Sequence, residues 1–259
     1  MFKNYKKLLA TLVPASVLVS VPSIAMAAAG SLDPKDYVGI SFWIISISMV
    51  AATAFFFLEA GKMTAKWRTS VVVSGLVTLV AAVHYFYMRD VWVATGTSPT
   101  VFRYVDWLIT VPLLMVEFYF ILAAVGLATI KVFWNLLIGT LVMLVGGYLG
   151  EVGAVDSTVG FVIGMIGWLY ILYYIFAGDA GTAMGNASEG VQSAFKAMRL
   201  IVLIGWAIYP LGYLLGYMMG SVDANSLNLI YNLADFVNKI AFGLVIWAAA
   251  TQTGGRRAK

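Results

Sequence analysis

Long stretches without Lys, Arg, Asp or Glu are the feature that most constrains how this chain can fold. Five of them are long enough to cross a bilayer: 37–58, 69–88, 132–150, 157–178 and 200–222. A transmembrane helix needs roughly 20 predominantly apolar residues. Two further apolar stretches, 101–125 and 226–250, carry a few charges inside them. The sequence therefore predicts an all-α membrane protein, a bundle of seven transmembrane helices.

The composition agrees with this fold class. Of the 259 residues, 62% are hydrophobic and only 11% are charged, whereas soluble domains carry about 25% charged residues. An ordinary soluble enzyme, a nucleic-acid-binding protein and a disordered scaffold are therefore excluded. The absence of cysteine excludes disulfides and thiolate chemistry. With one histidine and no cysteine, no metal site is predicted.

The N-terminal segment has the pattern of a secretory signal. Lysines at positions 3, 6 and 7 precede an apolar stretch, 8–26, that is broken by Pro14 and Pro22 and ends in Ala25-Met26-Ala27. A basic start, an apolar centre and a small-x-small end are typical of a cleavable signal peptide. We expect residues 1–27 to be removed, leaving a transmembrane domain at 28–259; the alternative is an uncleaved first transmembrane helix.

Charged residues between the expected spans alternate in sign along the chain. Basic side chains occupy every second connection and the C-terminal tail: Lys62, Lys66, Arg68, Lys131, Lys196, Arg199, Arg256, Arg257 and Lys259. The intervening connections contain Glu151, Asp156 and Asp223. Because Lys and Arg are retained on the cytoplasmic side, we expect the mature N-terminus outside and the C-terminus in the cytoplasm.

Only five charged residues lie well inside the expected spans. These are Arg103, Asp106 and Glu117 in the third span, and Asp235 and Lys239 in the seventh. An ionised group at mid-membrane costs about 2.5–3.5 kcal/mol on insertion scales, so such groups face the interior, pair with one another and are functional by default.

The spacing in the third span places its polar groups on one face of a helix. Arg103, Asp106 and Thr110 are three and four residues apart. Glu117 lies 11 residues beyond Asp106, which is about 20° from the same face and about 16 Å further along the axis. A line of proton-exchanging groups from the outside toward the cytoplasm is the geometry of a proton path. Glu117 has no basic neighbour, which favours its protonated form and the role of a proton donor.

The seventh span supplies a buried amine with an acid one turn away. Asp235 and Lys239 are i, i+4, and Asp106 is a second candidate partner for the ammonium. A lysine in a dry pocket can form a Schiff base with a carbonyl compound. The alternative is an ion pair that only sets the relative position of two helices, but that alternative does not account for Glu117.

Two other polar or aromatic features are less specific. His84 lies in the second span, where it can serve function or simply hydrogen-bond a neighbouring helix. Trp206 and Tyr209 are i, i+3 in the sixth span and are followed by Pro210, which kinks a helix. Aromatic walls beside a kink can line a ligand slot, although ordinary aromatic packing explains this run on its own.

Five segments together resemble one known family. They are RYVDWLITVPLL at 103–114, GWAIYP at 205–210, DFVNK at 235–239, HYFYMR at 84–89 and GYLGE at 147–151. The chain resembles the microbial rhodopsins over essentially all of its mature length, and among them the marine bacterial proteorhodopsins. This combination of motifs is highly specific.

The resemblance implies all-trans retinal bound as a protonated Schiff base on Lys239. Asp106 would be the primary counterion and proton acceptor, Asp235 the second counterion, and Glu117 the cytoplasmic proton donor. His84 would pair with Asp106, and Arg103 would lie on the external side of the counterions. The polyene would be enclosed by aromatic residues: Trp107, Trp168, Trp206 and Tyr209.

In this family, the residues at three positions of the third span also distinguish which ion is transported. Here they are Asp106, Thr110 and Glu117, the pattern of outward proton pumps, and Leu114 at the colour-tuning site indicates green absorption. The resemblance thus implies a light-driven outward proton pump rather than an enzyme. It would be a homo-oligomer, pentameric or hexameric, in the bilayer of the bacterial inner membrane, with no nucleic-acid partner. The alternatives are a photosensory rhodopsin that signals to a partner protein and a seven-helix receptor or transporter without retinal.

Overall fold

The structure, a computed structural model, describes residues 33–254. The predicted signal peptide at 1–27 and the basic residues at 256–259 lie outside the described residues. Within the described part of the chain every regular element is helical, and seven helical spans are long and apolar enough to cross a membrane. The prediction of an all-α seven-helix membrane protein is confirmed.

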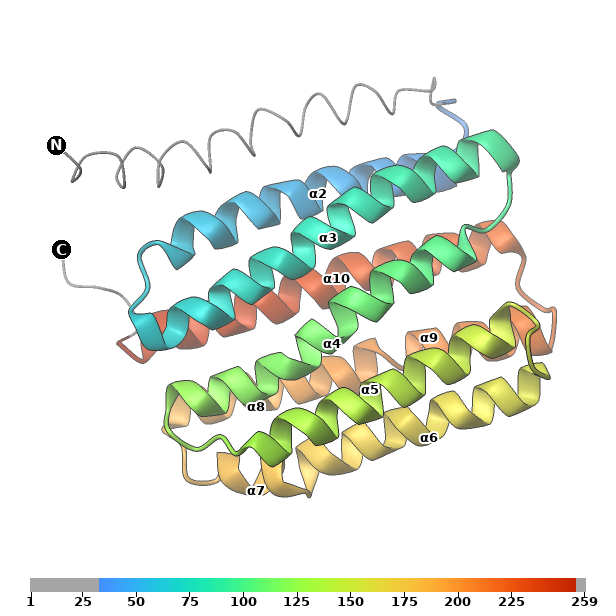
Figure 1. The fold of residues 1–259 in the computed structure, drawn as a ribbon. Helices are drawn as coiled ribbons and strands as arrows, with labels where there is room; N and C mark the ends of the chain where they lie inside the picture. The colour runs from blue at the N-terminus through green and yellow to red at the C-terminus, as the bar shows by residue number, and fades with distance from the viewer. Residues whose placement is uncertain (1–32, 255–259) are drawn as a thin grey trace, which may run out of the picture.

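The first four of the seven spans are single uninterrupted helices (Figure 1). They are α2 (Tyr37–Ala60), α3 (Ala65–Thr95), α4 (Thr100–Ala124) and α5 (Ile130–Glu151). The fifth span combines α6 (Ser157–Phe176) with the short α7 (Asp179–Met184). The sixth is built from α8 (Glu189–Leu200), η1 (Ile201–Gly205), α9 (Ile208–Tyr213) and η2 (Leu214–Met218). The seventh is α10 (Ala224–Gln252).

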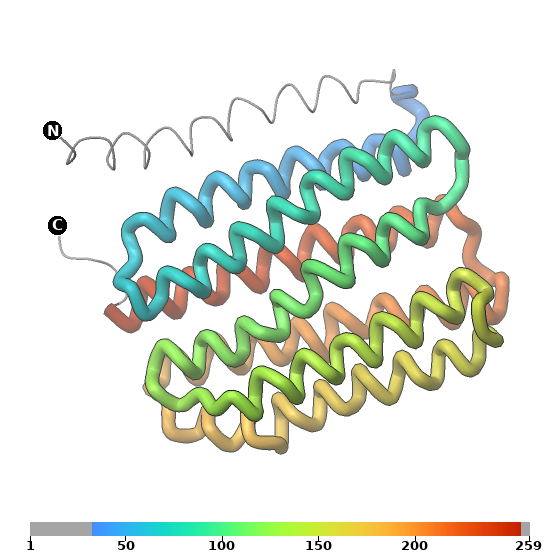
Figure 2. Tube along the Cα trace, in the orientation of Figure 1, coloured from blue at the N-terminus to red at the C-terminus, as the bar shows by residue number. Residues whose placement is uncertain are grey.

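The helices run up and down in chain order and close into a bundle (Figure 2). Each of α2 to α6 packs against the next, and α10 packs against α2, α3 and α8. The connections from α3 to α4, from α5 to α6 and from η2 to α10 lie at one end of the bundle, on the right of Figure 1. We call this end A, and we call the opposite end, which has the α2–α3, α4–α5 and α7–α8 connections, end B.

Aspartates begin three of the helices at end A. The carboxylates of Asp36, Asp156 and Asp223 accept hydrogen bonds from backbone N–H groups of the first turn of α2, α6 and α10. Such caps satisfy donors that have no partner within the helix. Hydrogen bonds from the Ser226 backbone and hydroxyl hold the pKa of Asp223 below its usual value. End A is therefore bordered by fixed negative charge.

The largest extensions beyond the predicted charge-free runs are in the second and sixth spans. Helix α3 continues through Arg89 and Asp90 to Thr95, because the Arg89 guanidinium is accommodated against the Trp43 ring, 5.3 Å from its centroid, and beside Asp90. The sixth span begins at Glu189 rather than at 200. Its first helix, α8, is amphipathic: one face is buried and the other carries the charges that ended the apolar run.

The sixth span is irregular, as the proline predicts. In η1 the hydrogen bonds are wider than in an α-helix, and the Trp206 N–H reaches back five residues to the Ile201 carbonyl. Pro210 has no N–H to donate to the Trp206 carbonyl, which instead accepts from Tyr209. The indole of Trp168 on α6 donates to the Val202 carbonyl within η1, 3.1 Å away. A neighbouring helix thus supports the irregular stretch.

Glycines bring α5 and α6 into backbone contact. A Cβ atom placed on Gly160 would lie 2.5 Å from the Gly150 Cα, and one on Gly167 would lie 2.5 Å from the Met143 nitrogen. Small residues allow this close approach of helices in membranes. This glycine seam sets the spacing between the two helices that close one side of the site.

Candidate functional site

The centre of the bundle holds a lysine between two carboxylates. Asp235 and Lys239 are one turn apart on α10, and Asp106 faces them from α4. The Lys239 Nζ donates to Asp106 and, over 3.1 Å, to Asp235. All three side chains are at most 3% exposed. The structure therefore brings together the three charges that the sequence selected in two separate spans.

The two carboxylates differ in how completely they are hydrogen-bonded. Asp235 accepts from the Tyr209 hydroxyl at 2.6 Å, the Tyr85 hydroxyl at 2.8 Å and the Trp107 indole at 3.2 Å. Asp106 Oδ1 is buried and has no hydrogen-bond partner among the described residues. Both oxygens of Asp235 thus have hydrogen-bond donors, whereas one oxygen of Asp106 has none among the described residues.

His84 and Thr110 lie beside Asp106 without bonding its carboxylate. The His84 Nδ1 is 3.9 Å from Asp106 Oδ1 and 2.9 Å from the Val80 carbonyl, to which it donates within its own helix. The Thr110 hydroxyl donates to the backbone carbonyl of Asp106 over 3.0 Å. The predicted neighbourhood of His84 and Asp106 is present, with a gap longer than a hydrogen bond.

Arg103 lies on the end A side of the carboxylates. Its guanidinium donates to Asn228 and Asn232, both at 2.9 Å, and to Tyr85 at 3.3 Å. Through Tyr85 it is linked to Asp235 rather than bonded to either carboxylate. The two asparagines were missed in the sequence, although their positions relative to Asp235 and Lys239 place all four on one face of α10.

A cavity extends from the lysine between α4, α5, α6 and the sixth span. About 780 Å³ between these elements is not occupied by atoms, a volume that includes space open to the surroundings. The cavity is lined by every residue predicted to bind the cofactor: Trp107, Leu114, Trp168, Trp206, Tyr209 and Lys239. An aromatic, largely apolar slot that ends at an amine fits a long apolar molecule with a terminal carbonyl group.

Glu151 is a cavity residue that the sequence did not identify. We expected it in a connection, but it is the last residue of α5 and lines the end A side of the cavity. Its Oε1 accepts a hydrogen bond from the Tyr104 hydroxyl at 2.8 Å. The fourth span was predicted to end before Glu151, because a glutamate next to glycines is typical of the start of a loop. This contact was therefore not predicted.

Glu117 lies on α4 toward end B and is completely buried. Its Oε1 accepts from the Ser74 hydroxyl of α3 at 3.0 Å, and its Oε2 has no hydrogen-bond partner among the described residues. No ion pair joins it to a basic side chain in the described part of the chain. This is the isolated carboxyl that the sequence predicted.

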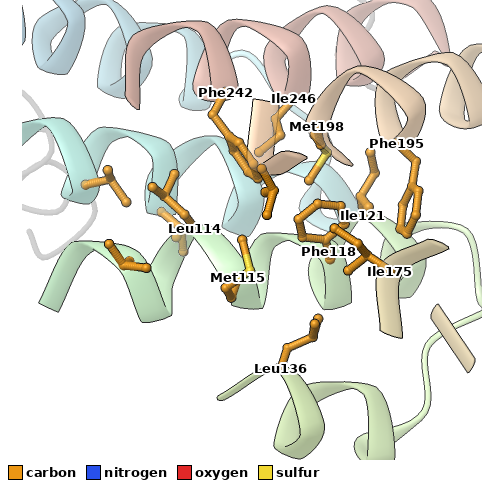
Figure 3. Close-up of a cluster of buried hydrophobic side chains, with 14 of the residues drawn as sticks. Leu114, Met115, Phe118, Ile121, Leu136, Ile175, Phe195, Met198, Phe242 and Ile246 are labelled. Atoms are coloured by element: carbon orange, nitrogen blue, oxygen red, sulfur yellow. The ribbon is translucent and has the colours of Figure 1, made fainter. Parts of the chain in front are cut away.

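Apolar side chains fill the bundle around and beyond Glu117. Figure 3 shows this apolar cluster, which we define as Leu114, Met115, Phe118, Ile121, Leu136, Ile175, Phe195, Met198, Phe242 and Ile246. The rings of Phe195 and Phe242 meet the Phe118 ring edge-on, with centroids 5.0 and 5.7 Å apart. Between α4, α8 and α10, the half of the bundle toward end B is therefore packed hydrocarbon.

The fold and this cavity together define a seven-helix membrane protein with a largely apolar cavity next to a buried lysine. The family model described as bacteriorhodopsin-like protein matches residues 36–253, and the chain belongs to this family, the microbial rhodopsins.

Individual relatives are similar over nearly their full length. The blue-light absorbing proteorhodopsin of Gamma-proteobacterium Hot 75m4 is 54% identical over 236 residues, which cover 90% of this chain and 94% of that protein. The green-light absorbing proteorhodopsin of Gamma-proteobacterium EBAC31A08 is 53% identical and covers 91% and 94%. The crystal structure of the blue light-absorbing proteorhodopsin from Med12 has a TM-score of 0.74 at 53% identity and covers 84% of this chain and 100% of that chain. Overall identity therefore does not distinguish the two colours.

Proposed function

We propose that this protein is a light-driven outward proton pump that carries all-trans retinal on Lys239. The observation that carries the proposal is the arrangement along α4: Asp106, with a free oxygen, contacts the lysine, and Glu117, with no ion pair, lies in the apolar half toward end B. One face of one helix thus presents an acceptor and a donor on either side of the nitrogen.

The residues present fit the cofactor. The cavity walls are aromatic and apolar, and the amine at its end has two carboxylates beside it. Bound through an imine to the Lys239 nitrogen, retinal would supply light absorption and a light-triggered change in the surroundings of that nitrogen. Trp107, Trp168, Trp206 and Tyr209 line the cavity and would hold and orient the polyene.

The chain's own groups then move the proton. Asp106 accepts the proton from the Lys239 nitrogen through Oδ2, the oxygen to which that nitrogen donates, while Asp235 stays ionised because two hydroxyls and an indole donate to it. Glu117 gives its proton to the nitrogen from the other side. Arg103, with its asparagine partners, keeps positive charge on the end A side of both carboxylates, which favours release of the proton there.

The orientation that makes this transport outward follows from the charges at the two ends. End B has most of the basic residues that lie in connections or in the helices next to them: Lys62, Lys66, Arg68, Lys131, Lys196 and Arg199. End A has mainly acids: Asp33, Asp36, Asp156 and Asp223. By the positive-inside rule, end B is cytoplasmic and end A external. From the similarity to the proteorhodopsins we also propose that the protein is a homo-oligomer in the bacterial inner membrane.

The test is light-driven pH change in cells that express the chain and are supplied with retinal. We expect external acidification on illumination, abolished by Asp106→Asn. Glu117→Gln should preserve the pigment but slow reprotonation of the lysine nitrogen in flash photolysis. Lys239→Ala should remove the visible band and serves as the matched control without pigment. Pumping that continues in Asp106→Asn would refute the mechanism, and a photocycle of seconds without acidification would favour the photosensory alternative.

A further inference from the structure

Polar side chains follow one face of α3 from end B to Glu117. Thr64 precedes the helix, and Trp67, Ser70 and Ser74 follow at spacings of three, three and four residues. At 100° per residue these four positions fall within about 120° of one another. Trp67, Ser70 and Ser74 are buried. This α3 track, Thr64–Trp67–Ser70–Ser74, covers about 15 Å along the axis.

Most of the track consists of polar atoms without a protein partner. The Thr64 hydroxyl, the Trp67 indole N–H and the Ser70 hydroxyl are buried and have no hydrogen-bond partner among the described residues, like Glu117 Oε2 where the track ends. Buried polar atoms in proteins are nearly always hydrogen-bonded, to protein or to ordered water. Several such atoms in a row, on one face, are therefore a place for bound water.

The track reaches the carboxyl group of Glu117 through Ser74. The Ser74 hydroxyl lies 3.0 Å from Glu117 Oε1 and 3.2 Å from the Ser70 carbonyl, so it can donate to either. Gly243 of α10 closes over this point, since a Cβ there would lie 3.1 Å from the Ser74 Cβ. Helix α10 thus packs directly against Ser74, whose hydroxyl faces Glu117.

The other way from end B to Glu117 is apolar. Between α4, α8 and α10 the space is filled by the apolar cluster, where Phe118 meets Phe195 and Phe242 (Figure 3). Hydrocarbon packing offers no hydrogen bonds for a proton to follow. Groups that can form hydrogen bonds are present on the side of Glu117 that faces the α3 track.

We propose that the α3 track is the route by which protons enter from end B and recharge Glu117. The proposal rests on the proposed function, in which Glu117 has lost its proton to the lysine nitrogen. A proton from end B passes along water held by Trp67 and Ser70 to the carboxylate: one O–H bond breaks at the last water and one forms at Glu117. Ser74 is a positioning residue, which orients the carboxyl through Oε1.

The experiment uses the full chain with retinal in membranes and measures proton uptake after a flash with a pH-indicating dye. Ser70→Ala and Trp67→Phe each remove one polar group and keep the packing. Losing one hydrogen bond from the relay should slow uptake about fivefold to tenfold. Ser46→Ala on α2 is the matched control, since this serine is equally buried but its hydroxyl is bonded to its own helix.

A second readout separates the route from general damage. The infrared carbonyl band of Glu117 should move in Ser74→Ala, which removes the donor to Oε1, and should stay in place in Ser70→Ala and Trp67→Phe. Unchanged uptake in both of the latter variants would overturn the route, as would equal slowing in Ser46→Ala. A wild-type protein that shows no Glu117-dependent reprotonation would instead refute the proposed function.

Discussion

The glycine seam between α5 and α6 allows a sharp test of how this bundle is held together. We consider Gly160→Ala against Gly164→Ala, two positions one turn apart in α6. A Cβ on Gly160 would lie 2.5 Å from the Gly150 Cα and 2.8 Å from its nitrogen, both backbone atoms. A Cβ on Gly164 would meet its nearest atom, the Met143 carbonyl oxygen, at 3.4 Å.

The two variants gain the same intrinsic helix propensity, about 1 kcal/mol for alanine over glycine, so their difference isolates the clash. Carbon atoms pack at about 3.5–4.0 Å, so Gly160→Ala forces the two backbones to move about 1 Å further from each other. Overpacking of this kind costs about 1–3 kcal/mol. For a chain of this size that corresponds to a melting temperature about 2–12 °C lower than that of Gly164→Ala.

The assay is thermal unfolding of both variants in the same detergent, followed by helical circular dichroism, which does not depend on the chromophore. Gly164→Ala should melt at or slightly above the wild-type temperature. If Gly160→Ala melts at the same temperature as Gly164→Ala, or higher, the backbone contact does not set the spacing of these helices and the reasoning is wrong.

Three further predictions concern the cavity. Leu114→Gln should move the visible absorption to shorter wavelength, and an unchanged spectrum would show that this position does not set the colour. Tyr209→Phe removes the 2.6 Å hydrogen bond to Asp235 and should cost about 1.5–3 kcal/mol, measured as a lower denaturation midpoint; an unchanged midpoint would contradict the role of this bond. Trp168→Phe removes the donor to Val202, so amide hydrogen exchange in η1 should rise while exchange in α2 stays constant.

The sequence predicted the membrane class, the number of spans and the buried charges because each rests on a strong local signal. A charge costs so much in a bilayer that Asp106, Glu117 and Lys239 could be selected without any knowledge of their neighbours. The structure brings Asp106 and Lys239 together from helices far apart in sequence.

What the sequence missed depends on partners that are distant along the chain. Ser74 is one hydroxyl among many in these spans, and only the packing of α3 on α4 places it against Glu117. Glu151 read as a loop residue because its stabilising contact, the Tyr104 hydroxyl, comes from another helix. The predicted end of α3 and the predicted start of the sixth span, now in α8, were wrong for a related reason. In α3 a cation–π contact of Arg89, and in α8 an amphipathic pattern, let charged residues continue a helix beyond the apolar run.

The apolar cluster also gives the molecule an uneven electrical profile. Toward end A, Arg103, Asn228 and Asn232 form a polar, polarisable network, whereas packed hydrocarbon fills much of the half toward end B. An electric field concentrates where the medium is least polarisable, so most of a membrane voltage falls across the cluster. Each elementary charge that crosses the full voltage does work of about 2.3 kcal/mol per 100 mV. Under the proposed function, a growing voltage would therefore oppose proton transfer in the hydrocarbon half first, and this half would limit the voltage against which the protein can pump.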